Sequence, residues 1–422
     1  MDDIIFECGR SIGCYGTFDV AVAGGGFAGV AAALSAARSG AATCLIEKTC
    51  APGGLGTLGL VVDYLPLCDG RGTKLVGGIG EELLRLSGKY GKTDFPACWR
   101  PDGDTEARKE QRYELTYSPA SMILLMEELL LEAGVSIFYD TRVCALSMQR
   151  RTIEALIVEN SSGRGAICCK SVVDATGDAV ICAFAGEQTA ESDKNVCAWW
   201  FYGETKNGLK LNRKTDNFYR ITPDMPLYSG TDHADVTALC VETRNRIRVF
   251  TQAVNNGCAA GLAGGELSHD GSSEVQTAGA PDRQYPAILP MIPQFRMTQR
   301  VITDYQLDEA DAGRWFEDCI GLTGDWRKRG PRYSIPYRAI CATQTENLLV
   351  AGRCISTTEA GWDIMRVIPT CAVTGEAAGA ACALAAMEHG GSVHDLPIEQ
   401  LQKHLRQQGV ILDRTLFGPA EN

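Results

Sequence analysis

Residues 18–29 read Phe18-Asp19-Val20-Ala21-Val22-Ala23-Gly24-Gly25-Gly26-Phe27-Ala28-Gly29, an apolar run that leads into a glycine-rich turn. The apolar run predicts a short buried strand, and the alanine-rich stretch 30–38 predicts the helix that follows the turn. Gly40 ends this helix, and the apolar residues 42–47 predict a second strand. A strand, a helix and a strand within about 30 residues form a parallel βαβ unit.

Three glycines of this turn, Gly24, Gly26 and Gly29, have the spacing G-x-G-x-x-G between a strand and a helix. In such a turn the first glycine allows the sharp bend, the second lets backbone amides approach a pyrophosphate, and the third lets the helix pack closely on the strand. Phe27 and Ala28 begin the helix, whose N-terminus attracts phosphate charge. The sequence therefore predicts a dinucleotide-binding turn rather than a glycine-rich turn without a ligand.

Glu47 ends the second predicted strand, roughly 20 residues after the glycines, where an acidic side chain accepts hydrogen bonds from the adenosine ribose. This unit alone does not separate FAD from NAD. Asp174-Ala175-Thr176-Gly177-Asp178 follows the apolar residues 171–173 and predicts a second turn that lies along the same dinucleotide.

Two later stretches also favour FAD. Residues 348–353 predict another strand that ends in glycine. Pro369 and Thr370 open a helix of small residues, whose positive end would stabilise charge at N1 and O2 of a reduced flavin. A tightly packed core helix explains this last stretch equally well.

The composition limits the partners of the protein. The chain has 422 residues and a net charge of −12, with no local cluster of lysine and arginine that reverses it. Nucleic acid binding needs a basic surface, so we expect no nucleic acid partner. Residues 1–8 lack the pattern of a secretory signal, and no apolar run reaches the roughly 18 residues that span a bilayer. We therefore expect a cytoplasmic protein without membrane contact, and a homo-oligomer remains open.

The 18 cysteines include no Cys-x-x-Cys pair. This spacing is the usual one for zinc and iron–sulfur sites, so we expect no metal site. Scattered cysteines in a long chain without a signal peptide are more often small buried side chains than a disulfide framework. The histidines have no ligand spacing either; His233 and His269 stay weak candidates for an acid or a base.

The predicted fold class is α/β, with a discontinuous Rossmann-like FAD-binding domain and an inserted, mixed but β-rich substrate domain. We assign residues 1–190 and 331–422 to the FAD-binding domain, including a β-meander at about 143–170. Residues 191–330 form the predicted insert, with one helix near 235–257. No second G-x-G-x-x-G occurs, so a dedicated NAD(P) domain is not expected, and the electron acceptor is unknown.

The chain resembles the FAD-dependent oxidoreductases of the glutathione-reductase-like structural class. Within this class it is most similar to the bacterial group often labelled simply FAD-dependent oxidoreductase. The resemblance rests on residues 19–48, 53–57, 172–178, 295–307 and 333–384. The last of these blocks is the most specific and contains Asn347-Leu348-Leu349-Val350-Ala351-Gly352-Arg353. The resemblance does not cover residues 190–290, where the substrate would be recognised.

The resemblance implies a set of cofactor contacts. Gly53, Gly54 and Thr57 would lie along the flavin, the backbone of Val143 would meet the adenine, and Gly352 with Arg353 would approach the pyrophosphate and the ribityl chain. Residues 366–370 would lie near the isoalloxazine ring. The complete set of expected FAD contacts is Gly24, Gly26, Phe27, Ala28, Gly29, Glu47, Lys48, Gly53, Gly54, Thr57, Val143, Ala175, Thr176, Gly177, Asp178, Gly352, Arg353, Arg366, Ile368 and Thr370.

Arg296 and Arg300 are the candidates for anchoring a substrate. They lie where similar proteins have an arginine-rich strand, although Gln299 replaces one arginine of that pattern. Arg296 would fix a carboxylate over the flavin, or else form a structural ion pair between domains.

The predicted function is hydride transfer between a small organic substrate and flavin N5, catalysed by an FAD-dependent oxidoreductase. The alternatives are a flavin-dependent enzyme with no net redox change, such as an isomerase or hydratase, and an FAD-binding sensor without catalysis.

Overall fold

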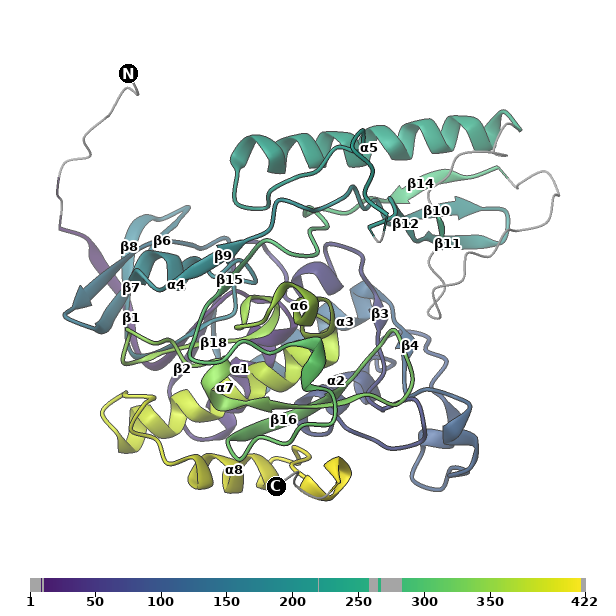
Figure 1. The fold of residues 1–422 in the computed structure, drawn as a ribbon. Coiled ribbons are helices and arrows are strands. Elements are labelled where there is room, and N and C mark those ends of the chain that lie inside the picture. Colours follow the sequence, from purple (N-terminus) through teal and green to yellow (C-terminus); the bar gives the residue numbers. More distant parts are fainter. Residues whose placement is uncertain (1–8, 10, 219, 258–264, 267–282, 419–422) are drawn as a thin grey trace.

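The computed structural model describes residues 9, 11–218, 220–257, 265–266 and 283–418, and its centre is a seven-stranded sheet (Figure 1). Five of its strands run parallel in the order β5-β2-β1-β8-β18. Their bounds are Gly13–Ala23 for β1, Thr43–Ile46 for β2, Ser136–Phe138 for β5, Gly163–Asp174 for β8 and Leu348–Val350 for β18. This arrangement confirms the predicted βαβ unit and the α/β class.

The predicted β-meander forms the other side of this sheet. Strands β6 (Arg142–Gln149) and β7 (Thr152–Asn160) are antiparallel to each other, and β7 is antiparallel to the first half of β8. The second half of β8 pairs instead with β18. As a result, β8 belongs to both the meander and the parallel part of the sheet.

Helices α1 (Phe27–Arg38) and α7 (Ile368–Glu388) pack along each other. Glycines on α7 make this close approach possible, since a Cβ on Gly375 would lie 2.1 Å from the carbonyl oxygen of Ala28 and one on Gly379 2.1 Å from that of Ala32. The other helices of this part are α2 (Gly78–Leu86), α3 (Pro119–Glu132), α4 (Val180–Ala185), α6 (Glu359–Met365) and α8 (Ile398–Gln407). Ser118 caps α3 and Pro119 begins it, as the sequence predicts.

Helix α7 is long and apolar enough to cross a membrane by length and composition alone, although Glu376 interrupts its apolar residues. However, 89% of the 18-residue apolar stretch within this helix is buried inside the protein. Its apolar surface is therefore explained by packing in the core.

Short two-stranded sheets complete this part of the protein. They pair β3 (Asp63–Tyr64) with β4 (Leu115–Thr116), β9 (Thr189–Glu191) with β15 (Gln299–Val301), and β16 (Cys319–Gly324) with β17 (Arg332–Pro336).

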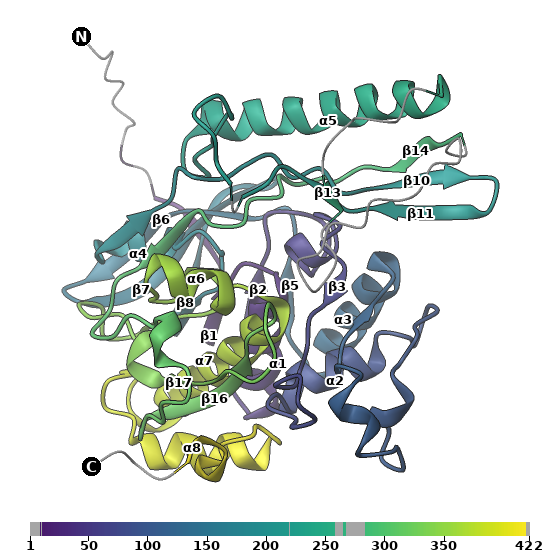
Figure 2. The same ribbon diagram turned by 45° about the vertical axis from the view of Figure 1, so that its right-hand side comes forward.

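A second, smaller part of the protein lies on one side of the central sheet (Figure 2). It contains the sheet β11-β10-β14 and the long helix α5 (His233–Asn255), which lies on the outer side of these strands, away from α7 and α8 in both views (Figures 1 and 2). The strands are β10 (Phe201–Thr205), β11 (Gly208–Asn212) and β14 (Tyr285–Ile288), with the short pair β12 (Lys214–Thr215) and β13 (Gly265–Glu266) beside them.

This smaller part has its own apolar core. Its buried members run from Cys197 to Phe295 and include Trp199 and Phe201, whose rings lie near Phe250 of α5. In contrast, buried residues from Val301 to Leu322 belong to the main core. The separate core is therefore shorter than the predicted insert 191–330, and the exact domain division stays a prediction.

Candidate cofactor-binding site

The glycine turn has the backbone geometry that its spacing predicts. Gly24 has a φ of +101°, and a Cβ there would lie 2.5 Å from the carbonyl oxygen of Ala175. A Cβ on Gly29 would lie 1.7 Å from the carbonyl oxygen of Gly24, so this glycine allows α1 to pack on the turn. At Gly26, by contrast, no atom lies within 4 Å of where a Cβ would be.

Gly26 is also the N-cap of α1, and no side chain caps this helix end. The first amides of a helix lack partners within the helix, so this end offers hydrogen-bond donors and a positive dipole end to an anion. Open space at Gly26 lets a ligand approach these donors.

A cavity of about 720 Å³ lies over this helix end. Its lining residues follow the carboxyl ends of β1, β2, β8 and β18, where open α/β sheets bind their ligands. The volume is that of a ligand site rather than a packing defect. Gly230, Thr231 and Val236 of the smaller part also line the cavity, so both parts of the protein enclose it.

Most of the FAD contacts expected from the sequence line this one cavity. They are Gly24, Gly26, Phe27, Ala28, Glu47, Lys48, Gly53, Gly54, Val143, Ala175, Thr176, Gly177, Asp178, Gly352, Arg353, Arg366 and Ile368.

Three expected contacts do not line the cavity: Gly29, Thr57 and Thr370. Gly29 packs against the turn, as described above. The Thr57 hydroxyl is buried and donates to the carbonyl oxygen of Pro52 at 2.7 Å, and the Thr370 hydroxyl pairs with that of Thr323 at 2.8 Å. These residues shape the surrounding backbone instead of facing the cavity.

The Glu47 carboxylate is buried and points back to the glycine turn. Its Oε2 accepts a hydrogen bond from the amide of Gly25 at 2.6 Å, and its Oε1 accepts from the amide and the hydroxyl of Thr49, both at 2.7 Å. A carboxylate has about four acceptor sites, so at least one remains for a ribose hydroxyl at the cavity wall.

The loop that contains Gly53 and Gly54 lies directly beside the turn. The Gly53 amide donates to the carbonyl oxygen of Gly25 at 2.7 Å, and Gly53 forms a parallel bridge with Gly26. Both glycines have positive φ angles, +99° and +52°. A residue with a side chain is strained in this conformation, so glycine lets the loop line the cavity with backbone alone.

The second turn, 175–179, is held by Asp174, which begins the predicted turn sequence but is not among the expected FAD contacts. Oδ1 of Asp174 accepts from Thr176, and Oδ2 accepts from the amides of Ile181 and Cys182 at the start of α4. Complete burial raises the pKa of Asp174, and these hydrogen bonds act against that effect. The signal that identifies Asp174 is its position at the end of a buried strand, directly before Ala-Thr-Gly.

Arg353 joins the two parts of the protein at the cavity. Its guanidinium donates to the carbonyl oxygens of Gly177 at 2.9 Å and Phe295 at 2.6 Å, and to Oδ1 of Asp178 at 2.7 Å. Lys48 lies 3.9 Å from the other oxygen of Asp178. The guanidinium of Arg353 is therefore already held by protein groups, and its direct contact with a pyrophosphate stays a prediction.

Neither candidate substrate arginine lines the cavity. The Arg296 guanidinium stacks on the ring of Phe218, 3.7 Å from its centroid. The Arg300 guanidinium stacks on Trp362 at 4.6 Å and donates to the carbonyl oxygen of Thr357 at 2.6 Å. Burial lowers the pKa of Arg300. These contacts explain both side chains structurally, and a substrate role for them stays a prediction.

Several apolar cavity residues were not identified from the sequence, because nothing in the pattern separates them from core residues. They are Leu55, Val180, Phe184, Ile292, Pro293 and Phe295. Cys371 also lines the cavity, but burial raises the pKa of its thiol to about 12, so the thiol is neutral at pH 7.

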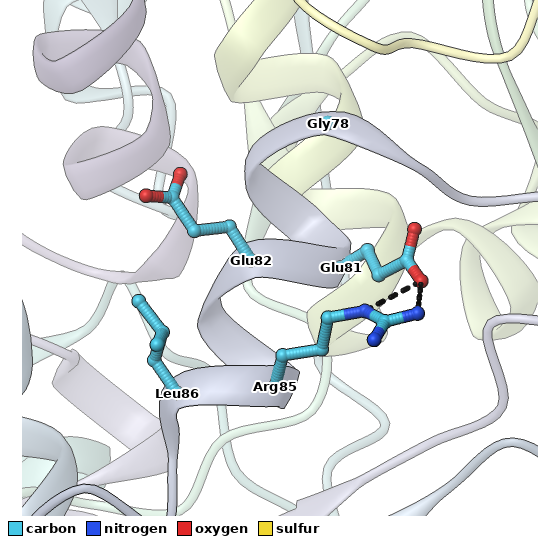
Figure 3. Close-up of a pocket in the computed structure, with 5 residues that line it drawn as sticks. All are labelled: Gly78, Glu81, Glu82, Arg85 and Leu86. Atoms are coloured by element: carbon cyan, nitrogen blue, oxygen red, sulfur yellow. Dashed lines mark hydrogen bonds and ion pairs between the residues drawn. The ribbon is translucent and has the colours of Figure 1, made fainter. Parts of the chain in front are cut away.

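A second hollow, of about 310 Å³, lies on α2 (Figure 3). Its charged side chains are paired: Glu81 binds Arg85 and Lys74, and Glu82 binds Arg38. Among the described residues, no three of the metal-ligating types form a cluster. The charged lining of this hollow is therefore explained by structural ion pairs.

The fold and the cavity together are typical of proteins that bind a dinucleotide at the carboxyl ends of a parallel sheet. A model of the FAD dependent oxidoreductase family matches residues 19–197 and 187–405, and the chain belongs to this family. It is therefore an FAD-dependent oxidoreductase. FAD fits the cavity because the uncapped end of α1 and Gly26 offer a place for the pyrophosphate.

The solved structures that match this chain have low sequence identity and TM-scores under 0.5. A flavocytochrome c3 fumarate reductase is 12% identical with a TM-score of 0.42, covering 89% of this chain and 80% of that one. The p-nitrophenol 4-monooxygenase PnpA from Pseudomonas putida is 13% identical with a TM-score of 0.45, covering 93% and 85%. The E. coli quinol fumarate reductase FrdA is 13% identical with a TM-score of 0.46, covering 93% and 74%. No curated protein matches the sequence significantly.

Proposed function

We propose that this protein binds FAD in the cavity between its two parts and transfers a hydride between a small organic substrate and flavin N5. The observation that carries the proposal is the uncapped N-terminus of α1 under Gly26, at the wall of a cavity of about 720 Å³. When bound, the flavin accepts a hydride and carries the added negative charge at N1 and O2.

The chain's own residues have separate roles in this proposal. The amides of Phe27 and Ala28 bind the pyrophosphate, and Glu47 binds the adenosine ribose. Because Glu47 follows β2 on one side of β1, the flavin lies toward the other side, near β18 and the start of α7. Ile368 and Arg366 line that end of the cavity.

The smaller part of the protein closes the cavity. Phe295, Ile292 and Pro293 add apolar surface, and Arg353 holds the segment at Phe295 against the turn at Gly177. Apolar walls exclude water, which strengthens the electrostatic interactions inside the site. We infer that the substrate approaches the flavin from this side.

The test is a search for substrates with the flavin as indicator. The purified protein is reconstituted with FAD and mixed without oxygen with candidate metabolites, and the flavin absorbance is recorded. The proposal expects at least one compound to bleach the flavin and to appear in oxidised form in equal amount. Product formation with no acceptor and no bleaching would instead establish an isomerase or hydratase.

The other predictions from the sequence stay proposals. They are a bacterial origin, a cytoplasmic location, and a lack of membrane and nucleic acid partners. Whether the protein forms a homo-oligomer is left undecided by the sequence. Sedimentation velocity of the FAD-loaded protein determines the oligomeric state.

A further inference from the structure

Arg366 is a charged side chain at the predicted flavin end of the cavity. Its guanidinium donates hydrogen bonds to one carboxylate, that of Asp363. Arg366 follows helix α6 and lines the cavity. Its Nε and Nη2 both donate to Oδ1 of Asp363, with Nε at 3.1 Å. Among the described residues its Nη1 has no protein partner, so this amino group remains for a bound molecule.

Asp363 is buried, with 7% of its surface exposed. Burial acts to raise the pKa of its carboxyl, but the charge and hydrogen bond of Arg366, with attraction from Arg296 and Arg327, outweigh burial and lower the pKa. Asp363 is therefore ionised at neutral pH and forms a true ion pair with Arg366.

The other nearby arginine with a carboxylate partner is held elsewhere. Arg327 binds both oxygens of Asp325, at 3.0 and 2.9 Å, and reaches Oδ2 of Asp363 only at 3.7 Å. This Oδ2 is buried and has no hydrogen-bond partner. Arg366 is therefore the side chain that hydrogen-bonds the Asp363 carboxylate, and Arg327 acts on it only through its charge.

We propose that Asp363 is a positioning residue, which holds the guanidinium of Arg366 at the cavity wall so that its charge stabilises the reduced flavin. This rests on the proposed function. A free arginine side chain samples many rotamers, and fixing its planar fork in advance removes that cost when negative charge appears on the flavin. Asp363 thus acts through Arg366 and not through direct contact with the ring.

The test is a double-mutant cycle on the midpoint potential of the bound flavin. The variants are Arg366→Gln, Asp363→Asn and their combination, each loaded with FAD and checked by circular dichroism. Arg366→Lys is the conservative variant, which keeps the charge but not the fork. The matched control is Arg338→Gln, whose ion pair with Asp318 at 2.8 Å lies outside the cavity.

Arg366→Gln is expected to lower the midpoint potential, and Arg366→Lys to give a value between Arg366→Gln and wild type. Asp363→Asn is expected to lower the potential in the wild-type background, the opposite sign to that of simply removing a nearby negative charge, and to have a much smaller effect when Gln occupies position 366. The control is expected to have no effect.

Equal shifts from Asp363→Asn in both backgrounds would overturn the proposal, because Asp363 would then act directly on the flavin. An unchanged potential in Arg366→Gln would overturn it as well. If the Asp363→Asn protein does not fold, a midpoint potential of Arg366→Lys equal to that of wild type would also overturn the proposal. FAD affinity, measured separately, tests the proposed function: a wild-type protein that binds no FAD would refute the binding site itself.

Discussion

The amide of Gly25 donates a hydrogen bond of 2.6 Å to Oε2 of Glu47, and so ties the glycine turn after β1 to the end of β2. The same carboxylate caps the chain beyond β2 through the amide and hydroxyl of Thr49. Glu47 therefore stabilises the shape of the turn, and in the proposed function it also accepts a hydrogen bond from the ribose.

Replacing Glu47 by Gln should weaken FAD binding. The amide group of the Gln side chain would bring two hydrogen-bond donors to a place where the amides of Gly25 and Thr49 already donate. A hydrogen bond to a charged group contributes about 1.5–3 kcal/mol, so we expect FAD affinity to fall by about tenfold or more, with a lower melting temperature. Titration of apoprotein with FAD measures this. Glu82→Gln, which removes only the surface pair with Arg38, is the control, and a Glu47→Gln protein that matches it would refute the role of Glu47.

Because Glu376 on α7 is buried, we expect the free energy of unfolding to fall as the pH rises. This carboxyl is fully buried beside the start of α2, where it accepts the Ile79 amide at 2.9 Å and leaves Oε1 without a partner. Burial raises its pKa from 4.5 to about 8; the Ile79 amide and Arg38 act to lower it, and Glu82 to raise it. Because the folded state holds the proton more tightly, stability is greatest below pH 4.5 for this group and falls until about pH 8.

Glu376→Gln is the variant that tests this dependence. Each pKa unit corresponds to 1.36 kcal/mol, so ionisation of Glu376 costs on the order of 5 kcal/mol by pH 9. We expect Gln at this position to flatten the decrease in unfolding free energy between pH 5 and about 8 in urea titrations. If wild type and variant have parallel pH profiles, Glu376 is already ionised in the folded protein.

Arg300→Ala should reduce stability and leave substrate kinetics unchanged. The guanidinium covers the buried ring of Trp362 and donates to Thr357, contacts that together contribute about 1–3 kcal/mol. Thermal unfolding and steady-state kinetics with a bleaching substrate measure the two effects. A variant with normal stability but a strongly raised KM for carboxylate substrates would restore the anchoring role, and Arg296→Ala is compared in the same assays.

The glycine turn could be predicted from the sequence because its geometry depends on neighbouring residues. A strand, three spaced glycines and a helix determine where Gly24 bends and where Gly26 leaves space. The parallel strands on either side follow from the same apolar runs. The helix of residues 233–255 was likewise predicted within two residues at each end.

The ion pairs of the site could not be predicted in this way. Arg353 meets Asp178 across 175 positions of sequence, so their pairing depends on the folded sheet and not on local pattern. Phe295 and Ile292 have the same apolar character as core residues, and only the structure brings them to the cavity. Buried residues from Val301 to Leu322 lie within the predicted insert 191–330 but pack into the main core, a contact that the local sequence pattern does not reveal.

The most direct test of the central claim is FAD affinity after Gly26→Ala. No atom lies within 4 Å of the new Cβ, so the apoprotein should fold and lose only about 1 kcal/mol for alanine at the N-cap, while the methyl group blocks the approach of the pyrophosphate to α1. Gly29→Ala should instead destabilise the fold, since its Cβ would lie 1.7 Å from a carbonyl oxygen. Gly13→Ala, with equally open space but at the far end of β1, is the control.

The measurement is the dissociation constant of FAD for the folded Gly26→Ala and Gly13→Ala proteins. The account predicts at least about a tenfold loss of affinity, or 1.4 kcal/mol, for Gly26→Ala and none for Gly13→Ala. A folded Gly26→Ala protein that binds FAD with wild-type affinity would contradict the placement of the cofactor on this turn.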